Sequence, residues 1–110
     1  SISHCHCSQC RKHHGAAYAS FCNVLREDLE LTHGAENLKS FESSPSVSRQ
    51  FCGECGSSLF WSTSQGQYAD WISIAVGTLD TPIHCDKQKH ICVASKAGWH
   101  EITDPWPQHR

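Results

Sequence analysis

Three cysteines within six residues constrain this chain more than any other feature of its sequence. Cys5, Cys7 and Cys10 lie in the segment CHCSQC, and a second pair, Cys52 and Cys55, lies further along in CGECG. Zinc is bound by thiolates in a tetrahedron, with Zn–S distances of about 2.3 Å. Three thiols at this spacing can close on one such ion. We therefore expect a fold that brings their sulfur atoms to one point.

Eight cysteines in 110 residues also allow a disulfide framework, which is common in small secreted proteins. The close spacing of the first three favours convergence on one ion over bridges to distant partners. Cysteine patterns that serve metal or redox chemistry rather than disulfides are typical of reducing compartments. We therefore expect a cytoplasmic protein. The length is that of one domain, and we predict a single zinc-binding domain over residues 1–110.

The charge and hydropathy of the chain argue against two classes of partner. The formal net charge is −2 and the isoelectric point is about 6.5, so no basic surface predicts nucleic-acid binding. No uninterrupted apolar span reaches the length of a membrane helix. No apolar segment typical of a secretory signal opens the sequence. We expect neither a membrane nor a nucleic acid as a partner.

Short strands separated by turns predict an all-β domain of short antiparallel sheets with little helix. Alternation and β-branched or aromatic content mark the expected strands, while a brief basic helical turn after Cys10 should end at Gly15. The tail from Gly98 carries two tryptophans and two prolines and is expected to be irregular. The strands are expected at residues 16–25, 27–32, 38–41, 47–51, 58–63, 71–79 and 89–94.

The first cysteine group has the pattern of a reactive metal site. On a strand, residues two apart point to the same face, so Cys5 and Cys7 face one point and Cys10 turns back toward them. If these are the only protein ligands, the fourth zinc position is open to water or a substrate thiol. The alternative is a closed structural site, completed by one of His6, His13, His14 or Cys22.

The second cysteine pair supplies only two ligands, whereas a structural zinc site needs four. Cys52 and Cys55 could complete the first site, or bind metal with another cysteine of the chain (Cys22, Cys85 or Cys92). Their partners could also lie upstream of Ser1. A redox pair is a further alternative, because thiols in Cys-x-x-Cys segments often have lowered pKa values.

In these motifs the chain resembles the glutathione-dependent formaldehyde-activating enzyme family, which has an Mss4-like β fold. The resemblance is carried by HCHCSQCRK with a following Gly15, by RQFCGECGS, by ISIAVGTLD and by HICVASKAGW. These segments occupy residues 4–12, 49–57, 72–80 and 90–99, so they cover most of the chain in the family's order. The combination of Cys-x-Cys-x-x-Cys-Arg with a later Cys-x-x-Cys-Gly is specific.

The resemblance implies a catalytic zinc on Cys5, Cys7 and Cys10 and a structural zinc on Cys52 and Cys55. It also implies a carbon–sulfur lyase that joins glutathione to formaldehyde as S-(hydroxymethyl)glutathione. In the family the structural zinc takes two further ligands from an upstream Cys-x-Cys strand. That strand is either missing from this sequence, or the protein lacks the structural zinc. Its absence would leave a sheet edge unpaired, which favours pairing with a second chain as a homodimer.

The sequence thus supports a leading hypothesis and an alternative. The leading one is a zinc enzyme acting on glutathione and an aldehyde, with Arg11, Lys12, Arg49 or Lys96 as the candidates for holding substrate carboxylates. For Arg11 and Lys12 a solvated basic turn is the alternative interpretation. The alternative function is a non-catalytic, zinc-stabilised protein-binding module, and a closed four-ligand zinc site would favour it.

Overall fold

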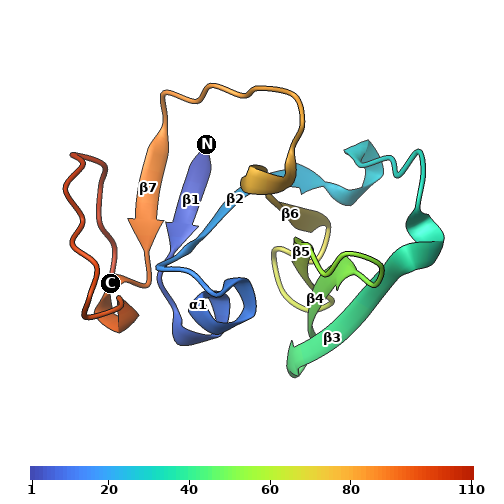
Figure 1. Ribbon diagram of the computed structural model, residues 1–110, viewed down its shortest axis with the longest axis horizontal. Helices are drawn as coiled ribbons and strands as arrows, with labels where there is room; N and C mark the ends of the chain where they lie inside the picture. Colours follow the sequence, from blue (N-terminus) through green and yellow to red (C-terminus); the bar gives the residue numbers. More distant parts are fainter. The chain divides into compact units, whose positions relative to one another are not determined.

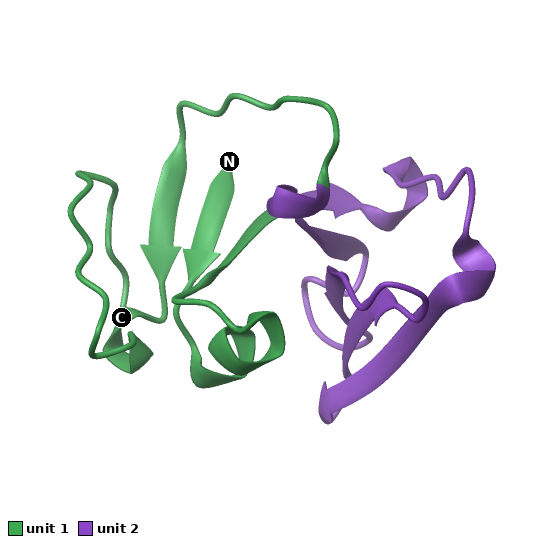
Figure 2. Cartoon of the chain, viewed as in Figure 1, with its two compact units in different colours: residues 1–22, 79–110 green, residues 23–78 purple.

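Seven strands, one α-helix and four short 3₁₀ helices form the protein in the computed structural model, which describes residues 1–110. The chain divides into two compact units (Figure 2). Unit 1 comprises Ser1–Cys22 and Leu79–Arg110, and unit 2 comprises Asn23–Thr78. In chain order the elements are β1 (Ile2–Cys5), α1 (Ser8–His14), β2 (Ala19–Leu25), η1 (Arg26–Asp28), η2 (Ala35–Asn37), β3 (Leu38–Ser44), β4 (Val47–Cys52), β5 (Ser58–Thr63), β6 (Trp71–Ala75), η3 (Val76–Thr78), β7 (Gln88–Ile91) and η4 (Val93–Ser95).

The predominance of short strands confirms the predicted fold class. The strands are hydrogen-bonded in the order β3-β4-β5-β6-β2-β1-β7, and β2 begins in unit 1 and ends in unit 2. The expectation of a single domain over residues 1–110 stays a prediction. No helix in the structure combines the length and the apolar character needed to cross a bilayer.

In unit 1, β1 lies between β2 and β7 (Figure 1). It pairs with β2 in the antiparallel sense and with β7 in the parallel sense, so that His4 is opposite His90. The sheets were expected to be antiparallel, and the parallel β1–β7 pair is the departure from that expectation. Parallel partners need a long connection, and here the whole of unit 2 lies between the two strands in sequence.

The residues after β7 keep close to that strand although they are irregular, as predicted. The backbone N–H of His90 donates to the carbonyl of Pro107 over 2.8 Å, and the N–H of His109 donates to the carbonyl of His90 over 2.9 Å. The end of the chain is thereby joined to the strand that lies beside β1. The core of unit 1 consists of Ile2, Cys5, Cys10, Ala19, Phe21 and Ala97, with two buried histidines, His6 and His90.

Unit 2 is built on the antiparallel succession β3-β4-β5-β6. The turn at residues 45–46 joins β3 to β4, with Ser46 at φ 68°. Between β4 and β5 the chain makes the tight turn that contains Cys52 and Cys55. There the N–H of Gly56 donates to the carbonyl of Cys52 over 2.7 Å, and the N–H of Cys52 donates to the carbonyl of Ser57 over 2.9 Å.

Three predicted strands are absent or end earlier in the structure. No strand forms over residues 27–32, because Arg26–Asp28 folds into a local 3₁₀ turn closed by the N–H of Leu29 on the carbonyl of Arg26. The strand expected over 71–79 ends at Ala75, where the Thr78 hydroxyl donates to the Ala75 carbonyl over 2.7 Å and favours a turn. The strand expected over 89–94 ends at Ile91, because Cys92 adopts φ 57°.

Candidate metal centre

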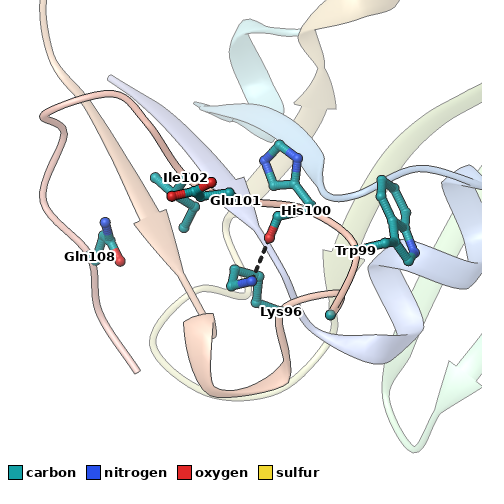
Figure 3. Close-up of a pocket in the computed structure, with 7 residues that line it drawn as sticks. Lys96, Trp99, His100, Glu101, Ile102 and Gln108 are labelled. Atoms are coloured by element: carbon teal, nitrogen blue, oxygen red, sulfur yellow. Dashed lines mark hydrogen bonds between the residues drawn. The ribbon is translucent and has the colours of Figure 1, made fainter.

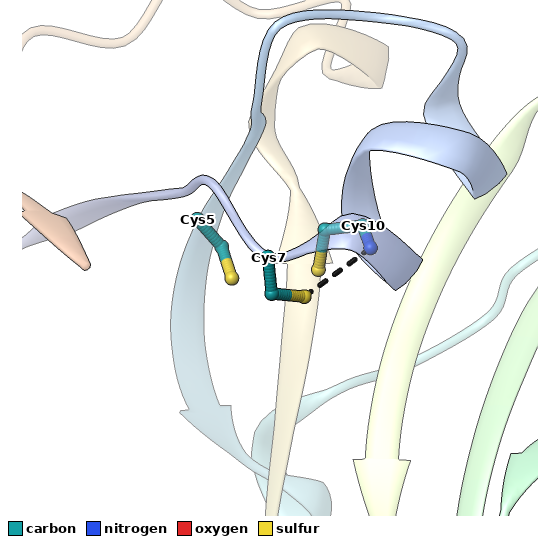
Figure 4. Close-up of side chains that lie close together, drawn as sticks. All are labelled: Cys5, Cys7 and Cys10. Carbon is teal, nitrogen blue, oxygen red and sulfur yellow. Dashed lines mark hydrogen bonds between the residues drawn. The ribbon is translucent and has the colours of Figure 1, made fainter. Parts of the chain in front are cut away.

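The thiol groups of Cys5, Cys7 and Cys10 lie together at the point where β1 passes into α1 (Figure 4). The three sulfur atoms are within 4.8 Å of one another. Cys5 is the last residue of β1, Cys7 immediately precedes α1, and Cys10 lies in the first turn of the helix. This group can hold a metal ion, as the spacing predicted.

Local backbone structure accounts for the convergence. Cys7 is the N-cap of α1, with extended φ and ψ values of −62° and 153°, and its sulfur accepts the N–H of Cys10 over 3.3 Å. Capping of this kind satisfies one of the free N–H groups at the start of a helix. At the other end, Gly15 adopts the left-handed conformation that commonly ends helices. The helix is therefore fixed at both ends, and Cys10 is held facing Cys7.

The electrostatics of the group favour a bound cation. A hydrogen bond with the Cys10 thiol and burial raise the pKa of Cys5, and the backbone N–H of Cys7 offsets only part of this rise. Cys5 and Cys10 are 7% and 3% exposed. Three thiolates cannot share so small and buried a space unless a positive charge compensates them. A set of three sulfur donors is soft, and zinc is a metal that such sets bind well.

None of the four residues considered as a protein ligand for the fourth position joins this group. His6 is fully buried, and its Nε2 instead lies 2.8 Å from Nδ1 of His90. His13 and His14 form the end of α1, with their rings edge to face. Cys22 lies in β2 and is partly buried. The candidate ligands grouped at this point are thus three thiols.

The cations predicted to hold a substrate have different surroundings. Arg11 follows Cys10 in α1, and its Nε donates to the carbonyl of Ser95 over 3.1 Å. Lys12 is exposed. Arg49 lies on β4 in unit 2, is 3% exposed, and donates from Nε to the Ser43 hydroxyl over 3.0 Å. Arg11 thus connects α1 to the segment that precedes Lys96.

A pocket of about 490 Å³ lies in unit 1 along the segment that begins at Lys96 (Figure 3). The Lys96 ammonium donates to the carbonyls of Ala97 and His100. The indole of Trp99 is 76% exposed, which leaves its ring free to contact a ligand. The His100 ring lies 6.3 Å from the ring of His6. The full lining is Lys96, Gly98, Trp99, His100, Glu101, Ile102 and Gln108.

In unit 2, the turn that carries Cys52 and Cys55 brings their side chains into hydrogen-bonding contact. Cys55 is exposed, and its sulfur is 3.2 Å from the Ser57 hydroxyl. Hydrogen bonds from the Ser57 hydroxyl, from the Ser57 backbone and from the Cys52 thiol lower the pKa of Cys55. Lowered thiol pKa values favour metal binding as well as redox chemistry. The assignment of this pair to a structural zinc stays a prediction.

The family model named "Glutathione-dependent formaldehyde-activating enzyme" matches residues 1–95. The chain belongs to this family. The match includes both cysteine groups and confirms the resemblance seen in the sequence.

Two fungal proteins of the family share sequence with this chain. One from Aspergillus flavus and one from Aspergillus oryzae, each named "Putative glutathione-dependent formaldehyde-activating enzyme", are 34% identical to it over 56 residues. The matched segment is 51% of this chain and 29% of each fungal protein. The comparison with these curated relatives therefore covers less than a third of their length.

A crystal structure of a Rhodobacter sphaeroides protein has the same fold. The TM-score is 0.60 at 24% sequence identity, and the alignment covers 74% of this chain and 71% of the other. At this identity the similarity establishes the architecture alone.

Sequence reasoning missed a group of aromatic and histidine side chains in unit 1. The His4 ring lies 5.0 Å from the rings of Tyr18 and His90, and the His6 ring lies 4.9 Å from Tyr18. His6 and His90 are both buried within this group. The one available signal was the alternation of histidine with cysteine in residues 4–7, which places His4 and His6 on the face opposite the thiols.

Proposed function

We propose that this protein is a zinc-dependent enzyme that joins glutathione to formaldehyde, or to a related aldehyde, as a carbon–sulfur lyase. The observation that carries the proposal is the cluster of three sulfur atoms within 4.8 Å of one another. It lies in the region that matches the formaldehyde-activating family. Cys5, Cys7 and Cys10 would hold the zinc. The three-thiol donor set supports this assignment more than a closed, four-ligand site.

Zinc on three thiolates would supply a position at which an incoming thiol binds as its thiolate, the reactive nucleophilic form. In the overall reaction a carbon–sulfur bond forms and the π bond of the aldehyde carbonyl breaks. The carbonyl oxygen takes up the proton that the thiol has lost. Neither an oxidant nor a reductant is needed, so the reaction is balanced with the two substrates alone.

The pocket beside His100 is the place we propose for the carboxylate-bearing part of the thiol substrate. Lys96 lies on its wall, and Trp99 presents an exposed ring that can pack against a peptide. Lys12 is exposed on the helix that carries Cys10 and is the second cation we assign to this role. Arg11 contributes by tying α1 to Ser95. Arg49 is the least suited of the predicted cations, since it is buried against Ser43.

We further propose a reducing location, the cytoplasm, because the structure pairs none of the eight cysteines in a disulfide. Disulfides persist in oxidising compartments, whereas clusters of reduced cysteine are typical of reducing ones.

The proposal is tested by following formaldehyde and glutathione exchange by NMR in the presence of the zinc-loaded protein. We expect the protein to accelerate exchange, and Cys7→Ser to reduce the acceleration at least about tenfold, because a ligand thiolate is lost. Cys85→Ser is a matched control, since Cys85 is partly buried in unit 1 but donates only to the carbonyl of Lys87. A zinc-loaded protein without any effect on exchange would contradict the proposal.

A further inference from the structure

Three side chains form a hydrogen-bonded row that leads from the metal-binding segment toward the C-terminus: His6, His90 and Asp104. Nε2 of His6 is 2.8 Å from Nδ1 of His90. Nε2 of His90 is 3.1 and 3.0 Å from the two carboxylate oxygens of Asp104. The two histidines are 0% and 1% exposed, so the contact between them is buried, whereas the Asp104 side chain is 38% exposed and forms the solvent-facing end.

The chemical nature of each partner determines which ring nitrogen of His6 and His90 carries a proton. A carboxylate only accepts hydrogen bonds, so Nε2 of His90 carries the proton that Asp104 accepts. Nδ1 of a neutral His90 is then an acceptor, and Nε2 of His6 donates to it. This leaves Nδ1 of His6 as a buried atom without a hydrogen-bond partner. Such an atom destabilises a folded protein by about 1–3 kcal/mol, so the two histidines are an unfavourable way to fill a core.

The backbone of His90 is hydrogen-bonded as well as its side chain. The N–H of His90 donates to Pro107, and its carbonyl accepts the N–H of His109. The N–H of His6 in turn donates to the carbonyl of Ile91 over 3.0 Å. His6 is therefore fixed through both its backbone and its ring, and it is the residue between Cys5 and Cys7.

We propose that His90 and Asp104 are positioning residues for the metal centre: through His6 they hold the segment between Cys5 and Cys7 in the shape that binds the ion. Supporting hydrogen bonds around metal ligands commonly contribute about 10- to 100-fold to metal affinity. Asp104 lies outside residues 1–95 that match the family. The inference rests on the proposed metal centre and does not depend on the aldehyde chemistry.

The experiment measures the affinity of the full chain for Zn²⁺ by competition with a chromophoric chelator, and the absorption spectrum of the Co²⁺ form. His90→Phe keeps an aromatic ring but removes both hydrogen bonds. His90→Asn places an amide oxygen near the position of Nδ1 and keeps the contact with His6. Asp104→Asn weakens the outer contact alone. Thermal unfolding of each metal-free variant is followed alongside.

We expect zinc affinity to fall about 10- to 100-fold in His90→Phe, with a changed thiolate-to-cobalt absorption band. His90→Asn should recover most of the affinity, and Asp104→Asn should lie between the wild type and His90→Phe. If His90→Phe does not fold, Asp104→Asn alone tests the proposal. Unchanged zinc affinity and an unchanged cobalt spectrum in Asp104→Asn and in any folded His90→Phe protein would overturn it, even if those variants were less stable.

A second histidine–aspartate pair provides the matched control. His84 and Asp86 are in contact over 2.7 Å, but their side chains are 87% and 91% exposed. His84→Asn and Asp86→Asn remove the same chemical groups at a solvated site, and we expect zinc affinity to stay at the wild-type value. A loss there equal to that in Asp104→Asn would also overturn the proposal. Because no thiol or aldehyde is present, failure of this experiment is distinct from failure of the proposed reaction.

Discussion

At the scale of single residues, Cys7 has two roles that substitution can separate. Its sulfur is one of the three grouped thiols, and it also caps α1 by accepting the N–H of Cys10. Serine is among the best N-cap residues, whereas alanine is a poor one. Exchange of the sulfur for an oxygen therefore removes a zinc ligand but leaves the start of the helix satisfied.

We predict that Cys7→Ser loses most of its zinc but keeps the metal-free stability of the wild type. Cys7→Ala should lose the zinc and also about 1 kcal/mol of metal-free stability, because the cap is gone. Zinc content by elemental analysis and urea unfolding under reducing conditions measure the two effects. Full zinc content in Cys7→Ser would remove Cys7 from the proposed ligand set.

His6 predicts how stability depends on pH. Burial, together with electrostatic interactions with His90, His100, His4 and Lys96 that disfavour a charged imidazole, lowers its pKa from 6.5 to about 4. The unfolded chain therefore binds a proton between these values that the folded chain does not bind. The linkage contribution is fully present above pH 6.5 and is lost as the pH falls toward 4.

The measurement is the free energy of unfolding of the reduced, metal-free protein at intervals from pH 7.5 to 4. We expect a decrease in this range, and a shallower decrease in His6→Gln, which cannot be protonated. Burial raises the pKa of Asp104, but hydrogen bonds from His90 and Trp106 lower it overall, so its contribution is lost at the acid end of the range in both proteins and does not distinguish them. An equal slope in the wild type and His6→Gln would be inconsistent with a neutral, buried His6.

At the scale of elements, the turn between β4 and β5 depends on Gly53. A Cβ atom there would lie 2.8 Å from two side-chain carbons of Lys39 and 3.0 Å from the carbonyl oxygen of Asn37. The N–H of Gly53 also donates to that carbonyl, so the backbone cannot move away freely. This close approach keeps the Cys52–Cys55 turn against η2 and β3.

We predict that Gly53→Ala destabilises the protein by about 1–3 kcal/mol, the usual range for overpacking. Gly77→Ala is the matched control, because nothing lies within 4 Å of a Cβ at that position. Urea unfolding of both variants measures the free energy of unfolding that each retains. Equal stability of the two would show that the turn tolerates a side chain at residue 53.

The elements also show what the sequence can and cannot predict. The end of α1 at Gly15 and the turn around Cys52 were predictable, because both depend on residues adjacent in sequence. The strand expected over residues 27–32 had the right alternation, yet its first residues close a local turn instead. The contact between His6 and His90 joins residues 84 positions apart, and only the parallel pairing of β1 with β7 brings them together. No local pattern specifies that pairing.

At the scale of the whole molecule, the two cysteine groups belong to different compact units. The group of three lies in unit 1, and Cys52 and Cys55 lie in unit 2. The segment that matches the family includes both cysteine groups. The chain nevertheless spans only 29% of the length of the curated fungal relatives it matches. The activity of the whole protein is therefore a proposal that rests mainly on the chemistry of unit 1.

Binding of a metal to the folded chain alone must stabilise it. At a free zinc concentration about 100 times the dissociation constant, the gain is about 2.7 kcal/mol. We predict that chelation of zinc lowers the melting temperature of the wild type, and that Cys7→Ser loses the part of this shift due to the three-cysteine group. A shift of the same size in both proteins would assign the stabilising metal to other residues, such as Cys52 and Cys55.

The most direct test of the central claim is the absorption spectrum of the Co²⁺-substituted protein during titration with glutathione. Three protein thiolates with a fourth position that accepts a substrate thiol predict a tetrahedral, sulfur-rich spectrum. Its thiolate-to-cobalt band should gain intensity as glutathione is added, and S-methylglutathione, which has no free thiol, should leave it unchanged. A spectrum indifferent to glutathione would contradict the account and favour a closed site in a protein-binding module.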